Sequence, residues 1–288
     1  MNLQETLTQA LNEKWALPHF NISNAVQLRG IMNAAEELKS PIMIGTSGGE
    51  ADFISYKVSR ALVSAEAERT GIPVFLNADH FHSVEKCIEA IDAGYDSVII
   101  DMSKEDDEKN IEATKAVVEY AKKDGRDVHV EAELGYLVTD SSKIYKEEIE
   151  IPIESFTDPE QARVFVEDTK VDRFAAAFGT LHGIAANKPV LDFDRIVAIR
   201  KAIGDGVALV LHGGSGVVEE DFKKAIASGV NNVHISTHLR LAYTNALRVS
   251  LAADPEQATP YKFYAPVVEA VAEEAKKFII LFGSENKA

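Results

Sequence analysis

Three histidines stand out because each lies at the end of a short apolar run or just after one. His80 follows VFLNAD, His182 follows FAAAFGTL, and His212 ends ALVLH. Neutral imidazole nitrogens suit a borderline-soft divalent cation, and three such ligands leave a coordination position for a substrate. One histidine of this kind is most often a core residue. Three in equivalent positions predict a metal site.

Carboxylates occupy the same kind of position. Asp79 directly precedes His80, Asp101 ends the run SVIID, and Glu131 and Glu133 lie two residues apart in VHVEAEL. That spacing lets both glutamates point to one side of a strand. Beside a metal, a carboxylate can act as a base, a further ligand or a hydrogen-bond partner. Glu133 is the better candidate for the metal side, whereas Glu131 could equally be a structural residue neutralised by a barrel lysine.

Two glycine- and hydroxyl-containing segments are typical of a phosphate site. HGGSG, residues 212–216, follows the seventh apolar run, and HISTHLR, residues 234–240, includes the end of the eighth. Exposed backbone N–H groups at the start of a helix bind an anion without a basic cluster, and glycine lets the backbone approach it closely. GGSG alone is most often a plain turn. Its place after the seventh run favours phosphate binding.

A regular alternation of apolar runs and helical patterns positions these residues. The runs are continuously apolar, which is typical of strands buried on both faces of a parallel sheet. They cover residues 16–20, 42–46, 74–78, 97–101, 128–134, 174–178, 208–212 and 233–236. In a parallel barrel the carboxyl ends of the strands carry the chemistry, so the polar residues at these ends are expected to converge on one face.

The intervening helices have recognisable boundaries. Ser83 can cap a helix that ends near Gly94, Asp158 and Pro159 can open another, and acidic residues 219–221 suit the first turn of a third. Since no GxGxxG follows the first run, a (β/α)₈ TIM barrel is favoured over an open doubly wound sheet. The sequence thus predicts a single α/β domain over residues 1–288, with a long active-site loop at about 136–157 and a C-terminal helical extension at about 260–282.

The overall charge narrows the possible functions. Forty-six acidic and 30 basic residues give a formal net charge of −16, which argues against a nucleic-acid or membrane-surface binder because both need a basic face. A single cysteine, Cys87, excludes an internal disulfide framework. A polar N-terminal segment and the lack of a long apolar run predict a cytoplasmic protein.

Taken in order, these motifs resemble the class II, metal-dependent fructose-bisphosphate and tagatose-bisphosphate aldolases. The resemblance covers almost the whole chain. It is carried by WALPHFNISN (15–24), PIMIGTSGG (41–49), IPVFLNADHFHSVEKCIEAIDAGYDSVIIDMS (72–103), VEAELG (130–135), FGTLHG (178–183) and LVLHGGSGV (209–217). It implies a metal-dependent lyase that cleaves a ketose bisphosphate, most simply fructose 1,6-bisphosphate, to dihydroxyacetone phosphate and an aldehyde such as glyceraldehyde 3-phosphate. It also implies a homodimer or homotetramer.

The resemblance assigns roles to individual residues. Asp79 is implied as the catalytic acid/base, with His80, His182 and His212 as ligands of Zn²⁺ or another divalent metal and Glu133 near the metal. A monovalent cation is compatible with the family. Asn24, Ser47, Gly183, Gly213, Ser215, His234 and Thr237 match substrate- or phosphate-binding positions, and Asp101 and Glu131 match supporting ones.

The chain also departs from the family pattern. His234 stands where the family usually has asparagine, and VTDSSKIYKEEIE replaces a glycine-rich loop that bears a catalytic acidic pair, for which Glu147 or Glu148 are candidates. A family arginine for the far phosphate falls at Tyr261, next to Lys262. Lysine is a point charge without arginine's bidentate fork. These differences leave the choice of ketose phosphate open.

Other functions fit less well. A Schiff-base aldolase would require a lysine within an apolar run, and none of the eight runs has one. An amidohydrolase-like barrel would show HxH on its first strand, where this chain has His19, Phe20 and Asn21. Tagatose 1,6-bisphosphate or another ketose 1-phosphate remains an alternative substrate. A phosphate-binding barrel without catalysis is the remaining alternative.

Overall fold

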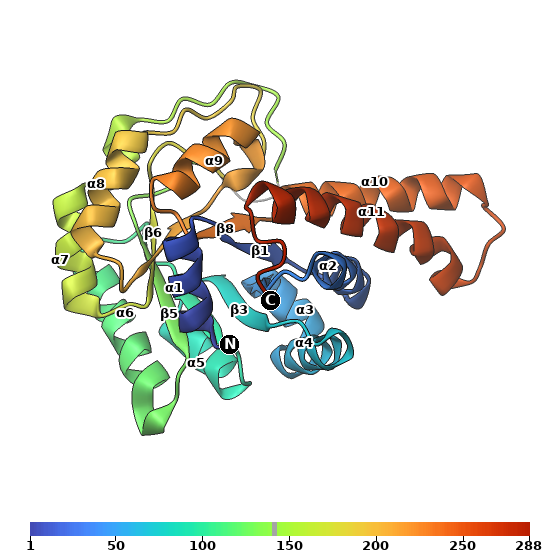
Figure 1. Cartoon of the computed structure of the whole chain (residues 1–288), viewed down its shortest axis with the longest axis horizontal. Coiled ribbons are helices and arrows are strands. Elements are labelled where there is room, and N and C mark those ends of the chain that lie inside the picture. Colours follow the sequence, from blue (N-terminus) through green and yellow to red (C-terminus); the bar gives the residue numbers. More distant parts are fainter. Residues whose placement is uncertain (140–142) are drawn as a thin grey trace.

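The computed structural model describes residues 1–139 and 143–288, and its centre is a closed parallel barrel whose eight strands follow chain order. Figure 1 shows helices surrounding this barrel. The strands are β1 Leu17–Asn21, β2 Ile42–Ser47, β3 Val74–Phe81, β4 Ser97–Ile100, β5 His129–Leu134, β6 Arg173–Ala176, β7 Ala208–Leu211 and β8 Asn232–Ile235. Pairing of Leu17 with Asn232 closes the ring. The predicted single-domain TIM barrel is confirmed.

The helices begin and end where the sequence signals indicate. Ser83 accepts a hydrogen bond from the N–H of Lys86 at the start of α5, and Asp158 caps α7, whose first residue is Pro159. The larger helices are α1 Leu3–Glu13, α2 Ala25–Leu38, α3 Gly48–Ile54, α4 Tyr56–Thr70, α5 Val84–Asp92, α6 Asp107–Lys122, α7 Pro159–Thr169, α8 Phe193–Ile203, α9 Glu219–Ala227, α10 Thr237–Ala253 and α11 Pro260–Leu281.

A polar layer lies inside the barrel, below the carboxyl ends of the strands. Arg173 on β6 donates hydrogen bonds to Asn77 on β3 (2.8 Å) and Asn232 on β8 (2.9 Å), so its side chain crosses the barrel interior. It also forms a fully buried ion pair with Glu131 on β5 at 2.7 Å. The expected partner of Glu131, a barrel lysine, is therefore wrong: an arginine fulfils this role.

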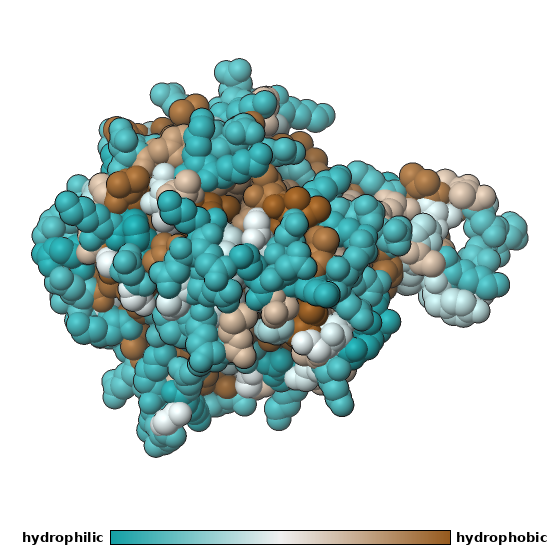
Figure 2. Space-filling model, in the orientation of Figure 1, coloured by the Kyte–Doolittle hydropathy of each residue, from teal (hydrophilic) through white to brown (hydrophobic). Residues whose placement is uncertain are grey.

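The last two helices form a hairpin that projects from the barrel (Figure 1). Helix α11 returns against α2, where Gly30 permits close packing: a Cβ there would lie 2.7 Å from the carbonyl oxygen of Val268. The face shown in Figure 2 is largely hydrophilic, with scattered hydrophobic groups. Among the described residues, no helix has the length and apolarity needed to cross a membrane.

The segment between β5 and α7 covers the loop expected at 136–157, of which residues 140–142 lie outside the described residues. Its described part runs beside the segment that follows His182: Ile144 pairs with Ile184, and Asn187 bonds the backbone of Ile149. Thr139 donates to the carbonyl oxygen of His182 at 2.7 Å. The long loop therefore contacts the chain that carries one of the site histidines.

Candidate metal centre and active site

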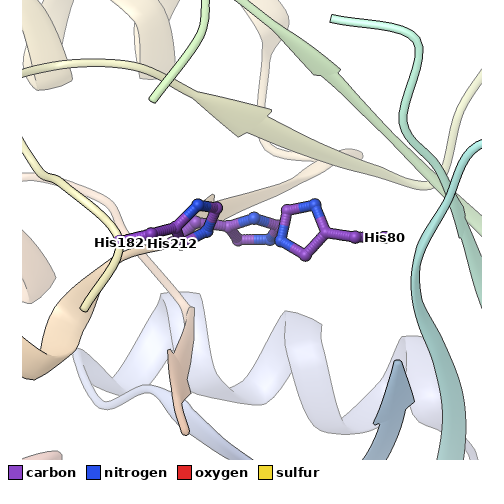
Figure 3. A group of neighbouring side chains, drawn as sticks. All are labelled: His80, His182 and His212. Atoms are coloured by element: carbon purple, nitrogen blue, oxygen red, sulfur yellow. The ribbon is translucent and has the colours of Figure 1, made fainter. Parts of the chain in front are cut away.

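The three predicted histidines converge at the carboxyl end of the barrel. His80 lies near the end of β3, His182 in the loop after β6, and His212 directly after β7. Figure 3 shows the His80 ring facing those of His182 and His212. One ring nitrogen of each lies within 4.8 Å of the others, and the His80 ring centroid is 5.0 Å from that of His182 and 4.6 Å from that of His212.

An irregularity in the backbone of β3 directs the His80 side chain toward the site. The β3–β4 register shifts between Ala78 and Phe81, which brackets Asp79 and His80. Such irregularities re-aim side chains and are common next to active sites. His80 also has φ of +51°, a left-handed conformation that residues other than glycine seldom adopt and that clusters at functional sites.

Carboxylates determine which imidazole nitrogens face the centre. His80 Nδ1 lies 2.7 Å from Asp101 Oδ2, and His212 Nε2 lies 2.7 Å from Glu131 Oε1. Each of these nitrogens donates to its carboxylate, so His80 offers Nε2 and His212 offers Nδ1 to a metal. His212 Nδ1 is buried without a hydrogen-bond partner, 3.4 Å from Glu133 Oε2, which also has none. This donor set fits a divalent cation.

The carboxylates of this centre favour positive charge on His80 and His212, whereas His182 stays neutral. Burial lowers the pKa of His80, but the charge of Asp79 and the hydrogen bond to Asp101 outweigh it and raise the pKa to about 9. Burial and the neighbouring His80 and His212 lower the pKa of His182 to about 3. Burial and the nearby Asp101 raise the pKa of Glu133.

Asp79 is the candidate base. Its Oδ2 accepts a hydrogen bond from Asn21 Nδ2 at 2.8 Å, and its Oδ1 lies 3.4 Å from His234 Nδ1. Burial alone would raise the pKa of Asp79, but the charge of His80 and the contact with His234 hold it well below the ordinary range. The carboxylate is therefore ionised at neutral pH, buried, and adjacent to the histidine cluster.

A small pocket joins the histidines to the two glycine- and hydroxyl-containing segments. It is lined by Asn21, Asp79, His80, His182, Gly183, His212, Gly213, Gly214, Ser215, His234, Ser236 and Thr237. Gly213 has φ of +67°, and a Cβ there would lie 2.4 Å from the carbonyl oxygen of Leu181. Only glycine fits this close approach. Thr237 begins the long helix α10, whose N-terminus favours an anion.

A larger pocket of about 420 Å³ opens beside the small one and shares four of its residues. It is lined by Asn21, Ser47, Gly48, Gly49, Asp79, His80, His82, Asp101, Ser103, Lys104, Glu133, Leu137, Thr139, His182 and Arg240. The shared residues include Asp79 and two of the three histidines. A ligand can therefore extend from one pocket into the other across the metal centre.

Most of the predicted binding residues line these pockets. Gly183, Gly213, Ser215, His234 and Thr237 line the small pocket, and Ser47, Asp101 and Glu133 line the large one. Glu131 lies beneath, bonded to His212 and Arg173.

Asn24 lies elsewhere than expected. Its Oδ1 accepts from the N–H groups of Val26 and Gln27, which caps α2, and its Nδ2 donates to Tyr243. It lines neither pocket, whereas Asn21 lines both. The structure thus places Asn21, rather than Asn24, at the pockets. The available signal was its place at the carboxyl end of the first strand, which is the criterion that selected the histidines.

Lys262, considered for the far phosphate, and the acidic candidates Glu147 and Glu148 all lie outside the two active-site pockets. Lys262 lines a separate cavity near the end of the α10–α11 hairpin, with Val249 and Phe263. Glu147 and Glu148 are not among the residues lining either active-site pocket. The large pocket is lined by Arg240. This arginine ends the HISTHLR segment, but the sequence patterns did not single out the residue itself.

A parallel barrel with three histidines, a buried aspartate and a glycine-lined pocket at one end defines a metal-dependent barrel enzyme. The family described as "Fructose-bisphosphate aldolase class-II" matches residues 1–287. The chain belongs to this family of metal-dependent lyases, as the sequence motifs predicted.

Similar proteins match over their full length. The fructose-bisphosphate aldolase of Geobacillus stearothermophilus is 36% identical over 291 residues, covering 100% of this chain and 98% of that protein. The Staphylococcus aureus (strain Mu50) enzyme is 35% identical, with 100% and 99% covered. Among solved structures, the YdjI aldolase from Escherichia coli K12 is 35% identical with a TM-score of 0.84, covering 100% of this chain and 98% of that one.

Proposed function

We propose that this chain is a zinc-dependent aldolase that reversibly cleaves fructose 1,6-bisphosphate to dihydroxyacetone phosphate and glyceraldehyde 3-phosphate. The observation that carries the proposal is the pair of connected pockets that share Asp79 and two of the three histidines. The small pocket suits the phosphate of the ketone half. The large pocket suits the aldehyde half, and the bond that breaks lies between them.

The residues support the following division of labour. Asp79, ionised and held by Asn21, takes the proton of the hydroxyl on the carbon that becomes the aldehyde. The carbon–carbon bond then breaks, and its electron pair passes into the ketone half to give an enediolate. His80, His182 and His212 would hold a divalent cation, and that cation would supply Lewis-acid stabilisation of the negative charge that develops on the ketone half.

Arg240 supports a second phosphate on the aldehyde half. Its Nη2 donates to Glu50, and Glu50 also accepts from Ser23 Oγ at 2.8 Å. The Arg240 side chain is 25% exposed and lines the large pocket together with Lys104. An arginine fixed in this way can direct the rest of its fork toward a phosphate.

The proposal is tested by measuring cleavage of fructose 1,6-bisphosphate, tagatose 1,6-bisphosphate and their 1-monophosphates, with and without a chelator. Fructose 1,6-bisphosphate should give the highest kcat/KM, and activity lost to the chelator should return most fully with Zn²⁺. Activity that resists the chelator would contradict the metal mechanism. Activity on monophosphates alone would contradict the bisphosphate assignment.

A further inference from the structure

His238 lies next to the HGGSG loop, residues 212–216, and lines neither active-site pocket. It is the second residue of α10, and its ring lies between two oxygen atoms. Its Nε2 is 2.8 Å from the carbonyl oxygen of Ser215, and its Nδ1 is 3.0 Å from Glu274 Oε1 on α11. The imidazole therefore joins the loop that follows β7 to the C-terminal helix.

Both partners of this ring are acceptors. A backbone carbonyl has no proton to give, and an ionised carboxylate has none either. Because a neutral imidazole carries only one N–H, satisfying both contacts requires an imidazolium ion. The electrostatics agrees: the hydrogen bond to Glu274 raises the pKa of His238, and the hydrogen bond from His238 lowers the pKa of Glu274 to about 2.

The position of this charge gives it a functional consequence. Among the described residues, no lysine or arginine lines the small pocket, although the proposed ligand group there is a phosphate dianion. Backbone N–H groups and the N-terminus of α10 supply only partial positive charge. Ser215 lines the pocket, and its carbonyl oxygen is the one that His238 holds.

We propose that His238 is a charged positioning residue that orients the Ser215 loop and presents the positive end of its ion pair with Glu274 toward the substrate phosphate. The inference rests on the proposed function, because it takes the small pocket to hold a phosphate group. Glu274 keeps the imidazolium in place from α11. The C-terminal helix is thereby coupled to ligand binding through a single side chain.

The proposal has a definite pH dependence. A histidine whose pKa is raised in the folded protein is fully charged below the ordinary value of about 6.5 and loses its charge as pH rises through the raised value. The charged groups that act on His238 within the described chain are Glu274 and Lys277, both on α11, and the ring of Phe278 packs beside it. Phosphate affinity should therefore fall on the alkaline side.

The test is the affinity of the zinc-loaded protein for inorganic phosphate, measured by calorimetry from pH 6 to pH 9. His238→Gln keeps a donor for Ser215 but removes the charge, and we expect Kd to rise roughly tenfold at pH 7. The ratio of variant to wild-type Kd should shrink toward one as pH rises, which separates the effect from the ionisation of phosphate itself. Lys276→Gln, which lies on α11 near Glu274 but is paired with Glu37 and Glu273, should change Kd by less than about twofold.

Glu274→Gln separates charge from structure, because it retains His238 and lowers its pKa. The phosphate affinity of this variant should approach that of the wild type toward pH 6, and it should fall to that of His238→Gln at a lower pH than in the wild type. Equal loss at every pH in both variants, unchanged Kd in both, or no phosphate binding by the wild type would each overturn the proposal. Failure of the proposed function would appear differently, as an absence of ketose cleavage while these phosphate affinities still depend on His238.

Discussion

The two halves of the site are built from different materials. The half proposed to hold the metal, called the metal half below, consists of side chains: two imidazoles at strand ends and one in the loop after β6, with Asp101 and Glu131 fixing two of the rings. The half proposed to bind phosphate, called the phosphate half below, consists mainly of backbone, with glycines that permit close approach and the N-terminus of α10. The metal half should therefore be sensitive to loss of single functional groups. The phosphate half should be sensitive to added atoms.

Replacing Asp101 tests the metal half and should give the largest effect on metal affinity. Asp101→Asn removes the charge that orients His80 at 2.7 Å, and metal affinity should fall about 10- to 100-fold. Phosphate binding at saturating metal should change little. Titration against a chelator of known affinity measures the first quantity, and calorimetry the second. An affinity for metal within twofold of the wild type would remove Asp101 from this role.

Adding one methyl group tests the phosphate half. Gly213→Ala would place Cβ 2.4 Å from the carbonyl oxygen of Leu181 at a position with φ of +67°, at a cost of about 1–3 kcal/mol. KM for the ketose bisphosphate should rise about tenfold or more, whereas metal content should stay at the wild-type level. Gly206→Ala is the matched control, because a Cβ there meets nothing within 4 Å. Equal effects in both variants would contradict a role for the close approach between Gly213 and the carbonyl oxygen of Leu181.

Replacing Arg240 tests whether the ligand extends into the large pocket, beyond the metal half and the phosphate half. Arg240→Ala should raise KM for fructose 1,6-bisphosphate about tenfold, since it removes charge-assisted hydrogen bonds to the second phosphate. The KM for a ketose 1-monophosphate should be nearly unchanged. Arg240→Lys should restore only part of the loss, because lysine lacks the planar fork. A parallel rise in KM for both substrates would indicate a structural role with Glu50.

Asn24 should show the smallest effect, confined to stability. Asn24→Ala removes the cap of α2 and should lower the free energy of unfolding by about 1 kcal/mol, with KM unchanged. Asn24→Asp, which retains a capping oxygen, should restore most of that stability. Denaturant unfolding and steady-state kinetics separate the two quantities. A large change in KM would contradict this purely structural role and would indicate that Asn24 contacts the substrate.

The sequence predicted the barrel and the convergence of His80, His182 and His212, because both depend on local patterns. Apolar runs mark the strands, and a histidine at a strand end is visible in the chain itself. The contacts that orient the site were not predictable in the same way. Arg173, for example, joins Glu131, Asn77 and Asn232 across the barrel, and this pairing exists only once the ring has closed.

The residues of the two pockets show a second reason why the sequence did not predict every part of the site. Asn21 and Asn24 are both asparagines near the end of the first strand, and only the backbone path decides which one enters the pocket. Arg240 comes from α10 and pairs with Glu50 on α3, far apart in the sequence. Long-range ion pairs of this kind carry no local signal.

The most direct test of the account is to replace Asp79 and measure cleavage and metal content on the same sample. Asp79→Ala removes the base but leaves His80, His182 and His212 intact. Cleavage of fructose 1,6-bisphosphate should fall on the order of 10³-fold while the protein retains its full complement of metal. Turnover within tenfold of the wild type, at unchanged metal content, would contradict the central claim that Asp79 acts as the base beside a three-histidine metal centre.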